Sequence, residues 1–222
     1  MSERRRPAFP LVLSGPSGAG KTSVAQWLLE NEPDVVSSVS CTTRERRGQE
    51  LEGIDYFYLA EQEFLDRRDR GDFLEWALVH GHLYGTPKTF LERQTEGGKI
   101  VLLDIDVQGA MQIKRSGIDA VLVFLMPPSM DDLEQRLRGR HTDSEDVIER
   151  RLAAARREME TAPEYDYLIV NHDLDTTRRA VHAVVEAERA KAHRVLRLNP
   201  VTSDPILSEV KARPFAKNLE RK

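Results

Sequence analysis

The chain has 222 residues, of which 40% are hydrophobic and 32% are charged, and this composition is typical of one globular domain with small inserted parts. Its net charge of −4 disfavours a general nucleic-acid or membrane-surface binder, because such proteins are usually basic. No apolar run is long enough to span a membrane, and the single cysteine, Cys41, excludes an internal disulfide. We therefore expect a cytoplasmic protein without nucleic-acid or membrane partners.

The first predicted element is a short buried strand over residues 9–13, and the sequence GPSGAGKT from Gly15 to Thr22 follows it. Apolar residues then recur at helical spacing over residues 24–29. A strand, a loop of the pattern GxxxxGK[ST] and a helix, in this order, are typical of a phosphate-binding loop.

The residue types of this loop explain its chemistry. Gly15, Gly18 and Gly20 can adopt backbone angles that are closed to other residues, so their N–H groups can surround a phosphate. The positive end of the following helix favours the same anion. Lys21 can place an ammonium group between phosphates, and the hydroxyl of Thr22 can hold Mg²⁺.

The middle of the chain predicts a β-rich subdomain inserted over residues 44–86, before a helix for which Thr86 provides the cap and Pro87 the first turn. The elements predicted in and around it are a strand over 35–42, a basic loop over 43–48, a strand over 56–59, a charged helix over 61–70 and a strand over 73–79.

The remaining chain alternates strands and helices, which predicts a doubly wound α/β core with a parallel sheet. Asp104 follows its most apolar strand, at the edge where such sheets bind ligands. A polar segment after residue 198 predicts a disordered tail over 199–222, and residues 1–8 predict a flexible arm. The predicted elements are strands over 100–103, 120–126 and 167–170 and helices over 129–138, 147–160 and 174–198.

Four further stretches carry candidate site residues, and each also has a purely structural interpretation. Arg44 and Arg47 have the spacing to hold one phosphate monoester, or they belong to a solvated basic loop. Tyr56 and Tyr84 each lie near a glycine, so they either donate to a phosphate or are strand-edge tyrosines. Glu75 alternates with apolar neighbours, so it is either an exposed strand residue or a buried base-recognition residue.

A carboxylate in that second role favours guanine, which offers the adjacent donors N1–H and N2–H₂, over adenine, whose N1 is an acceptor. Trp76, next to Glu75, is expected to be a core residue. The fourth stretch, residues 136–151, has arginines on both sides of a short polar segment. It predicts either a mobile lid over about 139–146 that carries positive charge to phosphates, or a set of surface ion pairs.

Taken together, GPSGAGKT, SCTTRERR, GIDY, FLEWA, YGT and LDIDVQG resemble the guanylate kinase family from about Pro10 to Arg194. The resemblance implies a P-loop kinase with a core over 9–43 and 87–198, a GMP-binding subdomain over 44–86 and a short lid. It also implies transfer of the γ-phosphoryl group of MgATP to GMP or dGMP. The alternative is an inactive guanylate-kinase-like module that binds a protein, and the intact phosphate loop disfavours it.

The resemblance further assigns site residues, in three sets. The implied catalytic residues are Lys21, Arg44, Arg140 and Arg151. The implied ATP-binding residues are Gly15, Pro16, Ser17, Gly18, Ala19, Gly20, Lys21, Thr22 and Asn171, with Mg²⁺ on Thr22 and, through water, on Asp104. The implied GMP-binding residues are Ser40, Arg44, Arg47, Tyr56, Glu75, Tyr84, Thr86 and Asp104.

Overall fold

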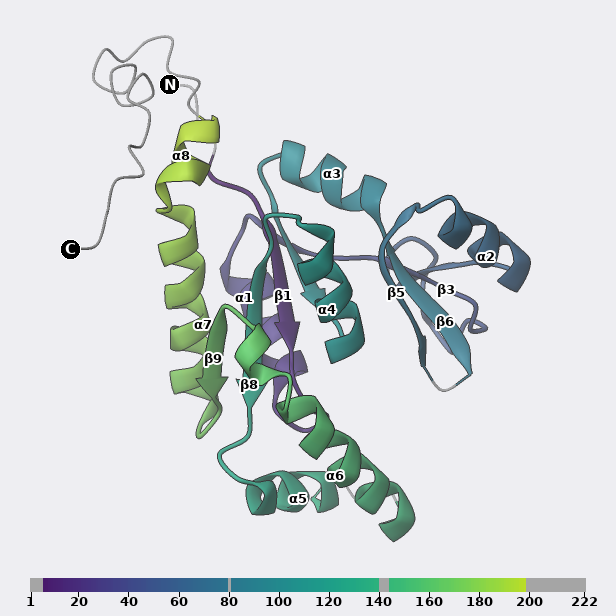
Figure 1. Ribbon diagram of the computed structural model, residues 1–222, viewed down its shortest axis with the longest axis vertical. Coiled ribbons are helices and arrows are strands. Elements are labelled where there is room, and N and C mark those ends of the chain that lie inside the picture. The colour runs from purple at the N-terminus through teal and green to yellow at the C-terminus, as the bar shows by residue number, and fades with distance from the viewer. Residues whose placement is uncertain (1–5, 80, 140–143, 199–222) are drawn as a thin grey trace, which may run out of the picture.

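Figure 1 shows the computed structural model of the protein, which describes residues 6–79, 81–139 and 144–198. Most of the predicted arm, the predicted tail over 199–222 and the candidate catalytic residue Arg140 lie outside these ranges. Among the described helices, none has the length and apolar character needed to cross a membrane.

The core is a five-stranded sheet in which all neighbouring strands are parallel, as the alternating pattern predicted. β1 lies at its centre and pairs with β7 on one side and with β8 on the other. In spatial order the strands are β2 (Val35–Ser37), β7 (Ile100–Asp104), β1 (Pro10–Ser14), β8 (Val121–Met126) and β9 (Tyr167–Val170).

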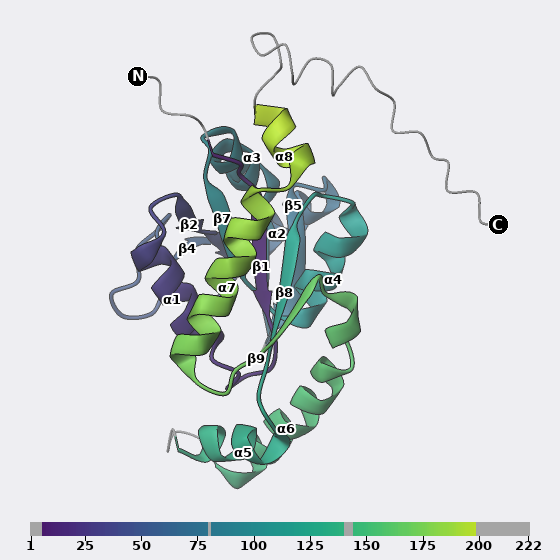
Figure 2. The same cartoon turned by 90° about the vertical axis from the view of Figure 1, so that its left-hand side faces the viewer.

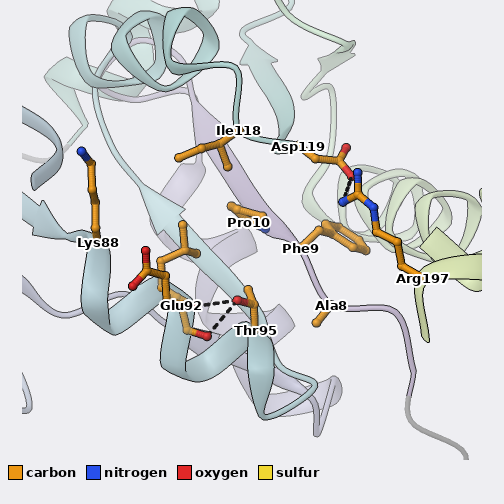
Figure 3. Close-up of a pocket in the computed structure, with 10 residues that line it drawn as sticks. Ala8, Phe9, Pro10, Lys88, Glu92, Thr95, Ile118, Asp119 and Arg197 are labelled. Carbon is orange, nitrogen blue, oxygen red and sulfur yellow. Dashed lines mark hydrogen bonds and ion pairs between the residues drawn. The ribbon is translucent and has the colours of Figure 1, made fainter. Parts of the chain in front are cut away.

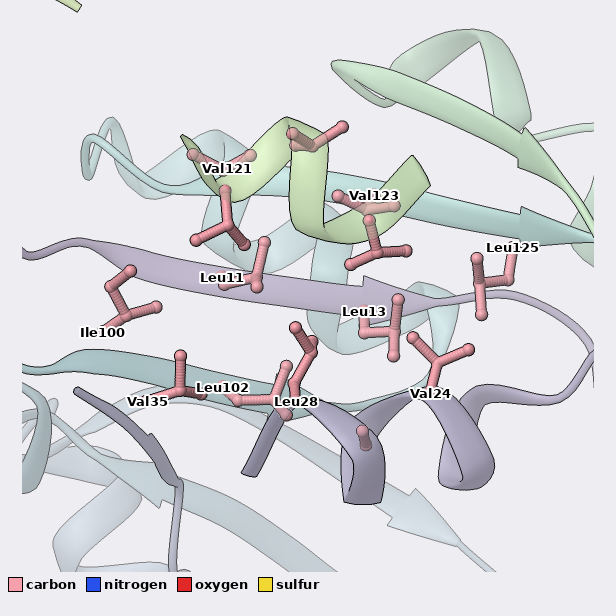
Figure 4. Packing of buried hydrophobic residues seen from close by; sticks show 14 of the residues in the cluster. Leu11, Leu13, Val24, Leu28, Val35, Ile100, Leu102, Val121, Val123 and Leu125 are labelled. Carbon is pink, nitrogen blue, oxygen red and sulfur yellow. The ribbon is translucent and has the colours of Figure 1, made fainter. Parts of the chain in front are cut away.

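Helices cover both faces of this sheet, because the central strands are apolar on both sides. Leu11 and Leu13 of β1 pack with α1 and α7 in one cluster (Figure 4), whereas Val12, between them, packs with α3 and α4 in a second cluster. These helices are α1 (Lys21–Asn31), α3 (Lys88–Glu96), α4 (Val107–Ser116) and α7 (Leu174–Arg189).

A second, smaller sheet lies beside the core and has its own apolar cluster, which includes the stacked rings of Phe64 and Phe73. In Figure 1 this sheet and its helix lie on the side of α3 and α4. Its order is β4 (Tyr56–Tyr58), β3 (Ser40–Thr42), β6 (His82–Pro87) and β5 (Phe73–Val79), and α2 (Glu61–Asp69) packs on it.

Two helices, α5 (Met130–Arg138) and α6 (Glu145–Met159), pack on each other through Leu133, Leu137 and Ile148. Figures 1 and 2 both place them beyond the end of the core sheet at which β1 and β8 terminate. Ser129 caps α5 as predicted, since its hydroxyl accepts from the main-chain N–H of Asp132 at 3.0 Å. A short 3₁₀ turn, Ala162–Glu164, then leads to β9.

Three predictions about elements were wrong. Residues 35–42 form two strands in different sheets. The pairing of β2 with β7 ends at Ser38, whose N–H donates to the Leu102 carbonyl, and the chain then crosses to the second sheet as β3. Thr86 does not cap α3. It lies within β6, and its hydroxyl donates a hydrogen bond to the Glu75 carboxylate instead. The helix predicted over 174–198 is interrupted after Arg189, and α8 (Ala192–Leu198) follows.

Candidate functional site

The phosphate loop lies at the carboxyl end of β1 and leads directly into α1, as the motif predicted. Gly15 and Gly20 have φ values of +136° and +97°, which residues with a Cβ rarely adopt. A Cβ would also lie 2.2 Å from the Leu125 carbonyl oxygen at Gly15 and 2.3 Å from the Asn171 amide nitrogen at Gly20. The sequence therefore requires glycine at both positions for space as well as for backbone angle.

Lys21 is the first residue of α1, and its ammonium group lies over the loop rather than in solvent. The Nζ atom donates to the Gly15 carbonyl at 2.5 Å and to the Pro16 carbonyl at 3.2 Å. Thr22 follows it and is exposed at the same helix end. The loop thus brings one cation, one hydroxyl and the positive end of α1 to one place.

Asn171 supports the phosphate loop from behind, from its position just after β9. Its buried side chain donates to the Ala19 carbonyl at 2.7 Å and accepts from the Thr177 hydroxyl at 2.9 Å. Arg136 of α5, which the resemblance did not assign, donates to the Asn171 carbonyl at 2.8 Å. The structure therefore joins the loop, the strand β9 and α5 through one residue.

Asp104 ends β7, whose neighbour in the sheet is β1, so its carboxylate lies beside the phosphate loop. Its side chain is exposed there, but desolvation by the surrounding protein raises its pKa. The positive charge of Lys21 acts in the opposite direction and lowers this pKa. Asp106 has a different role, because it caps α4 by accepting from the Gly109 N–H at 2.9 Å.

The predicted substrate-binding residues of the second sheet share one of its faces. Ser40 pairs with Tyr56, Thr42 with Tyr84 and Glu75 with Thr86, and paired residues point to the same side of a sheet. Since strand neighbours alternate, Cys41 and Leu83 point to the opposite face and join the apolar cluster under α2. The period of two therefore separates the candidate site from its core.

Glu75 is buried and heads a chain of hydrogen bonds on this face. The Thr86 hydroxyl donates to its Oε1 at 2.7 Å, and the Ser40 hydroxyl lies 3.3 Å from that of Thr86. Burial raises the pKa of Glu75 to about 7, which the Thr86 hydrogen bond only partly opposes. Trp76, expected in the core, is instead 37% exposed, and the guanidinium of Arg68 lies 5.3 Å from its ring centre.

Arg44 lies at the other end of the same face, almost fully buried, with its guanidinium 5.3 Å from the Tyr56 ring centre. It donates to Glu50 Oε1 at 2.8 Å, and this carboxylate raises the pKa of Arg44. Tyr56 and Tyr84 are in edge-to-face contact, with ring centres 5.9 Å apart. Arg47 is exposed in the same loop.

Sequence reasoning missed the group that holds Arg44 in place. Glu50 accepts from the Arg44 guanidinium, from the Arg47 N–H at 2.9 Å and from the Tyr58 hydroxyl at 2.7 Å. These donors lower the pKa of Glu50 to about 2, with Arg44 as the largest cause. The pKa of Tyr58 rises to about 12, because of desolvation and of its bond to Glu50. An acid six residues after a candidate arginine was the available signal.

The predicted lid stretch is described only at its two ends, Gly139 and residues from 144 onward. Arg138 forms ion pairs with Glu134 and with Glu145, so part of this stretch does contain the surface ion pairs of the alternative interpretation. Arg151 lies in α6, half-buried. Leu133 of α5 packs against Gly18, which places this helix pair on the phosphate loop.

One cavity adjoins the candidate phosphate-binding arginines, and a second lies away from the site. The first, of about 560 Å³, is lined by the basic loop from Thr43 to Arg47 and by Glu61, Gly81 and His82. The other, of about 300 Å³, is lined by residues that include Pro10, at the start of β1, and the Asp119–Arg197 ion pair (Figure 3). Because β1 begins there and the phosphate loop follows its end, this cavity lies at the opposite edge of the core.

The glycine loop and its lysine follow the central strand of a parallel sheet, and a separate sheet beside it carries a buried arginine and a buried carboxylate. These features define a P-loop kinase. Comparison with known proteins gives the family. The sequence model of the guanylate kinase family matches residues 7–188.

Relatives and a solved structure agree. A guanylate kinase of Myxococcus xanthus is 47% identical over 190 residues, which are 85% of this chain and 91% of that relative. One of Aromatoleum aromaticum is 50% identical over 185 residues, 83% and 91% respectively. The crystal structure of guanylate kinase from Anaplasma phagocytophilum is similar with a TM-score of 0.69 and 36% identity, covering 89% of this chain and 96% of that one.

The chain belongs to the guanylate kinase family. The predicted P-loop kinase fold and the predicted ATP:GMP phosphotransferase are therefore confirmed. The individual site residues and the subdomain boundaries stay predictions, as does the cytoplasmic location.

Proposed function

We propose that the two described sheets hold the two substrates of a γ-phosphoryl transfer from MgATP to GMP or dGMP. The observation that carries this proposal is the hydrogen-bond chain Ser40–Thr86–Glu75, on the sheet face whose Tyr56 ring is covered by the Arg44 guanidinium. It offers a carboxylate for guanine at one end and a guanidinium for the phosphate at the other. A nucleoside monophosphate has these two groups in the same order.

On the acceptor side, the GMP phosphate binds to Arg44 and Arg47, with the hydroxyls of Tyr56 and Tyr84 as additional donors. The guanidinium of Arg44 is fixed by Glu50, so little rotamer entropy remains to be lost on binding. Burial of Glu75 supports recognition of guanine, because the carboxylate that loses water needs two donors in return. Guanine N1–H and N2–H₂ supply them.

On the donor side, the β- and γ-phosphates of ATP bind in the loop from Gly15 to Thr22. Lys21 lies with its ammonium over this loop and neutralises charge on the transferred group. Asn171 contributes by fixing the loop at Ala19. Arg151 of α6 and Arg140, which is outside the described residues, supply further positive charge as the lid closes.

A phosphate monoester is itself the nucleophile at neutral pH, so the transfer needs no strong general base. Positioning the two phosphates in line and neutralising their charge account for the catalysis. Closure of the second sheet and of the α5–α6 pair on the core excludes water, which would otherwise accept the phosphoryl group.

The residues present fit a magnesium ion bound with ATP. No group of three or more His, Cys, Asp or Glu side chains able to hold a metal exists among the described residues, and Mg²⁺ typically takes only one or two protein ligands besides phosphates and waters. Thr22, in the first turn of α1, and Asp104, at the end of β7, are the two that would hold it, Asp104 through water. The ion would neutralise phosphate charge.

The binding-module alternative has no support in these contacts, since the loop, Lys21 and the acidic strand end are all retained. Glu75→Gln tests the proposal, because its amide replaces one acceptor by a donor with almost no change of volume. We expect kcat/KM for GMP to fall by at least about a hundredfold, while KM for ATP changes less than about twofold. Equal loss for both substrates would contradict the assigned role.

A further inference from the structure

Helix α4 of the core holds the free edge of β5 through a side-chain amide. Gln112 Nε2 donates to the Trp76 carbonyl at 2.7 Å, and the Trp76 N–H donates to Gln112 Oε1 at 3.1 Å. β5 is the edge strand of the second sheet, so among the described residues no further strand pairs with it on its outer side. The Gln112 amide therefore replaces a neighbouring strand at the residue directly after Glu75.

One turn earlier, α4 also contacts the Glu75 carboxylate itself. Gly109 is buried, and a Cβ placed on it would lie 2.8 Å from Glu75 Oε2. Because residues three apart lie on one side of a helix, Gly109 and Gln112 form a single contact surface on β5. The Gly109 contact limits the position of the Glu75 carboxylate, and the Gln112 contact holds the main chain of the next residue, Trp76.

The same helix is anchored in the core. Asp106 caps the helix by accepting from the Gly109 N–H. It lies two residues after the end of β7, on the side of the sheet that carries the phosphate loop. Ala110 and Ile113 of α4 pack with Leu74 of β5 in one buried cluster. The position of the Glu75 carboxylate is thus defined relative to the core, and not only within the second sheet.

We propose that Gln112 and Gly109 are positioning residues for guanine recognition, a role that rests on the function proposed above. Neither is expected to touch a substrate. They hold the Glu75 carboxylate at the place and orientation in which both oxygens accept from a purine with adjacent N1–H and exocyclic amino donors. Loss of either contact lets Glu75 shift, which weakens the recognition of the base and leaves the ATP side intact.

Gln112→Met tests the amide contact, since it keeps the length of the side chain and removes both hydrogen bonds. We expect KM for GMP to rise about tenfold, with kcat and KM for ATP within about twofold of wild type. The preference for GMP over inosine monophosphate, whose base lacks the amino group, should fall by about the same factor. Gln62→Met is the matched control, because Gln62 donates its hydrogen bond to Asp66 on the exposed surface of α2.

Gly109→Ala tests the carboxylate contact in a way that separates positioning from folding. Alanine favours a helix interior over glycine by about 0.5–1 kcal/mol, so an effect through helix stability alone would leave activity unchanged and raise the melting temperature. We expect instead that the added methyl displaces the Glu75 carboxylate. KM for GMP should rise about tenfold and the preference over inosine monophosphate should fall, while the melting temperature stays or increases.

The outcomes are distinguishable. If wild type phosphorylates GMP and both variants keep its KM and its preference for GMP, the inference is wrong and the proposed function stands. If wild type does not phosphorylate GMP, both are wrong. If Gln112→Met does not fold, Gly109→Ala decides alone. An equal rise of KM for GMP and for ATP in either variant would indicate general damage and would also overturn the inference.

Discussion

At the scale of single residues, the behaviour of Glu75 depends most on its surroundings. Its side chain is 5% exposed and its pKa is raised from the usual 4.5 to about 7, with burial as the main cause. The folded protein therefore binds this proton more tightly than the unfolded chain does. Between these two pKa values the folded state holds a proton that the unfolded state has lost, so stability decreases as pH rises through this window.

We predict that Glu75→Gln removes this pH dependence. As the pH rises from 5 to 8, the free energy of unfolding of wild type should fall relative to that of the variant by roughly 2–3 kcal/mol and stay level above pH 8. Urea unfolding of both proteins at several pH values measures it. A constant difference between them across this range would show that the Glu75 carboxyl titrates as in water.

Tyr58 is a residue whose role the sequence did not predict. We predict that Tyr58→Phe raises KM for GMP about threefold to tenfold, because Glu50 loses one of its donors and holds Arg44 less firmly. Steady-state kinetics with varied GMP and with varied ATP measure this. Tyr167→Phe is a control that removes a tyrosine–glutamate bond of the same kind, to Glu188, on the far side of the core. Equal effects of the two changes would contradict the assignment.

At the scale of elements, the phosphate loop depends on the strand end beneath it. We predict that Asn171→Ala raises KM for ATP and lowers stability by about 1–3 kcal/mol, because the buried Ala19 carbonyl and Thr177 hydroxyl lose a partner. ATP binding by calorimetry and thermal unfolding measure the two effects. Asn31→Ala is the matched control, since Asn31 caps an exposed carbonyl of α1. Unchanged ATP affinity would mean that the loop keeps its shape alone.

Local sequence patterns predicted most elements, because each pattern depends only on residues that are close together in the chain. The phosphate loop needs its glycines for backbone angle and space, and the apolar runs of β1, β7 and β8 are needed to fill both faces of the sheet. Contacts between distant segments were not predictable in this way. Gln112 and Trp76 are 36 residues apart, and nothing in either segment alone indicates the other. The break after Ser37 likewise depends on a sheet formed with later strands.

At the scale of the whole molecule, stability and activity are separated along the core sheet. The site lies at the carboxyl ends of the strands, whereas α8 is tied to the opposite edge, where Asp119 accepts from His193, Arg194 and Arg197. The guanidinium of Arg194 also lies 4.2 Å from the Phe9 ring centre. These contacts hold α8 against the start of β1, far from the phosphate loop.

We predict that Asp119→Asn lowers the free energy of unfolding by about 1–3 kcal/mol, since the buried Arg194 guanidinium loses one of its two carboxylate partners and keeps only Glu188. KM for GMP and for ATP should both remain within about twofold of wild type at 25 °C. Thermal unfolding and steady-state kinetics on the same sample check this. Altered substrate affinities would show that the two edges of the sheet are coupled.

The central claim is that one chain binds ATP on the phosphate loop and recognises guanine in the second sheet. The most direct measurement is ADP release from MgATP in a coupled assay, with GMP, AMP, UMP, CMP and dTMP offered separately to wild type and to a folded Lys21→Ala variant. We predict strong turnover with GMP only, and its loss in the variant. Comparable turnover with AMP, or GMP turnover that survives the loss of Lys21, would contradict the account.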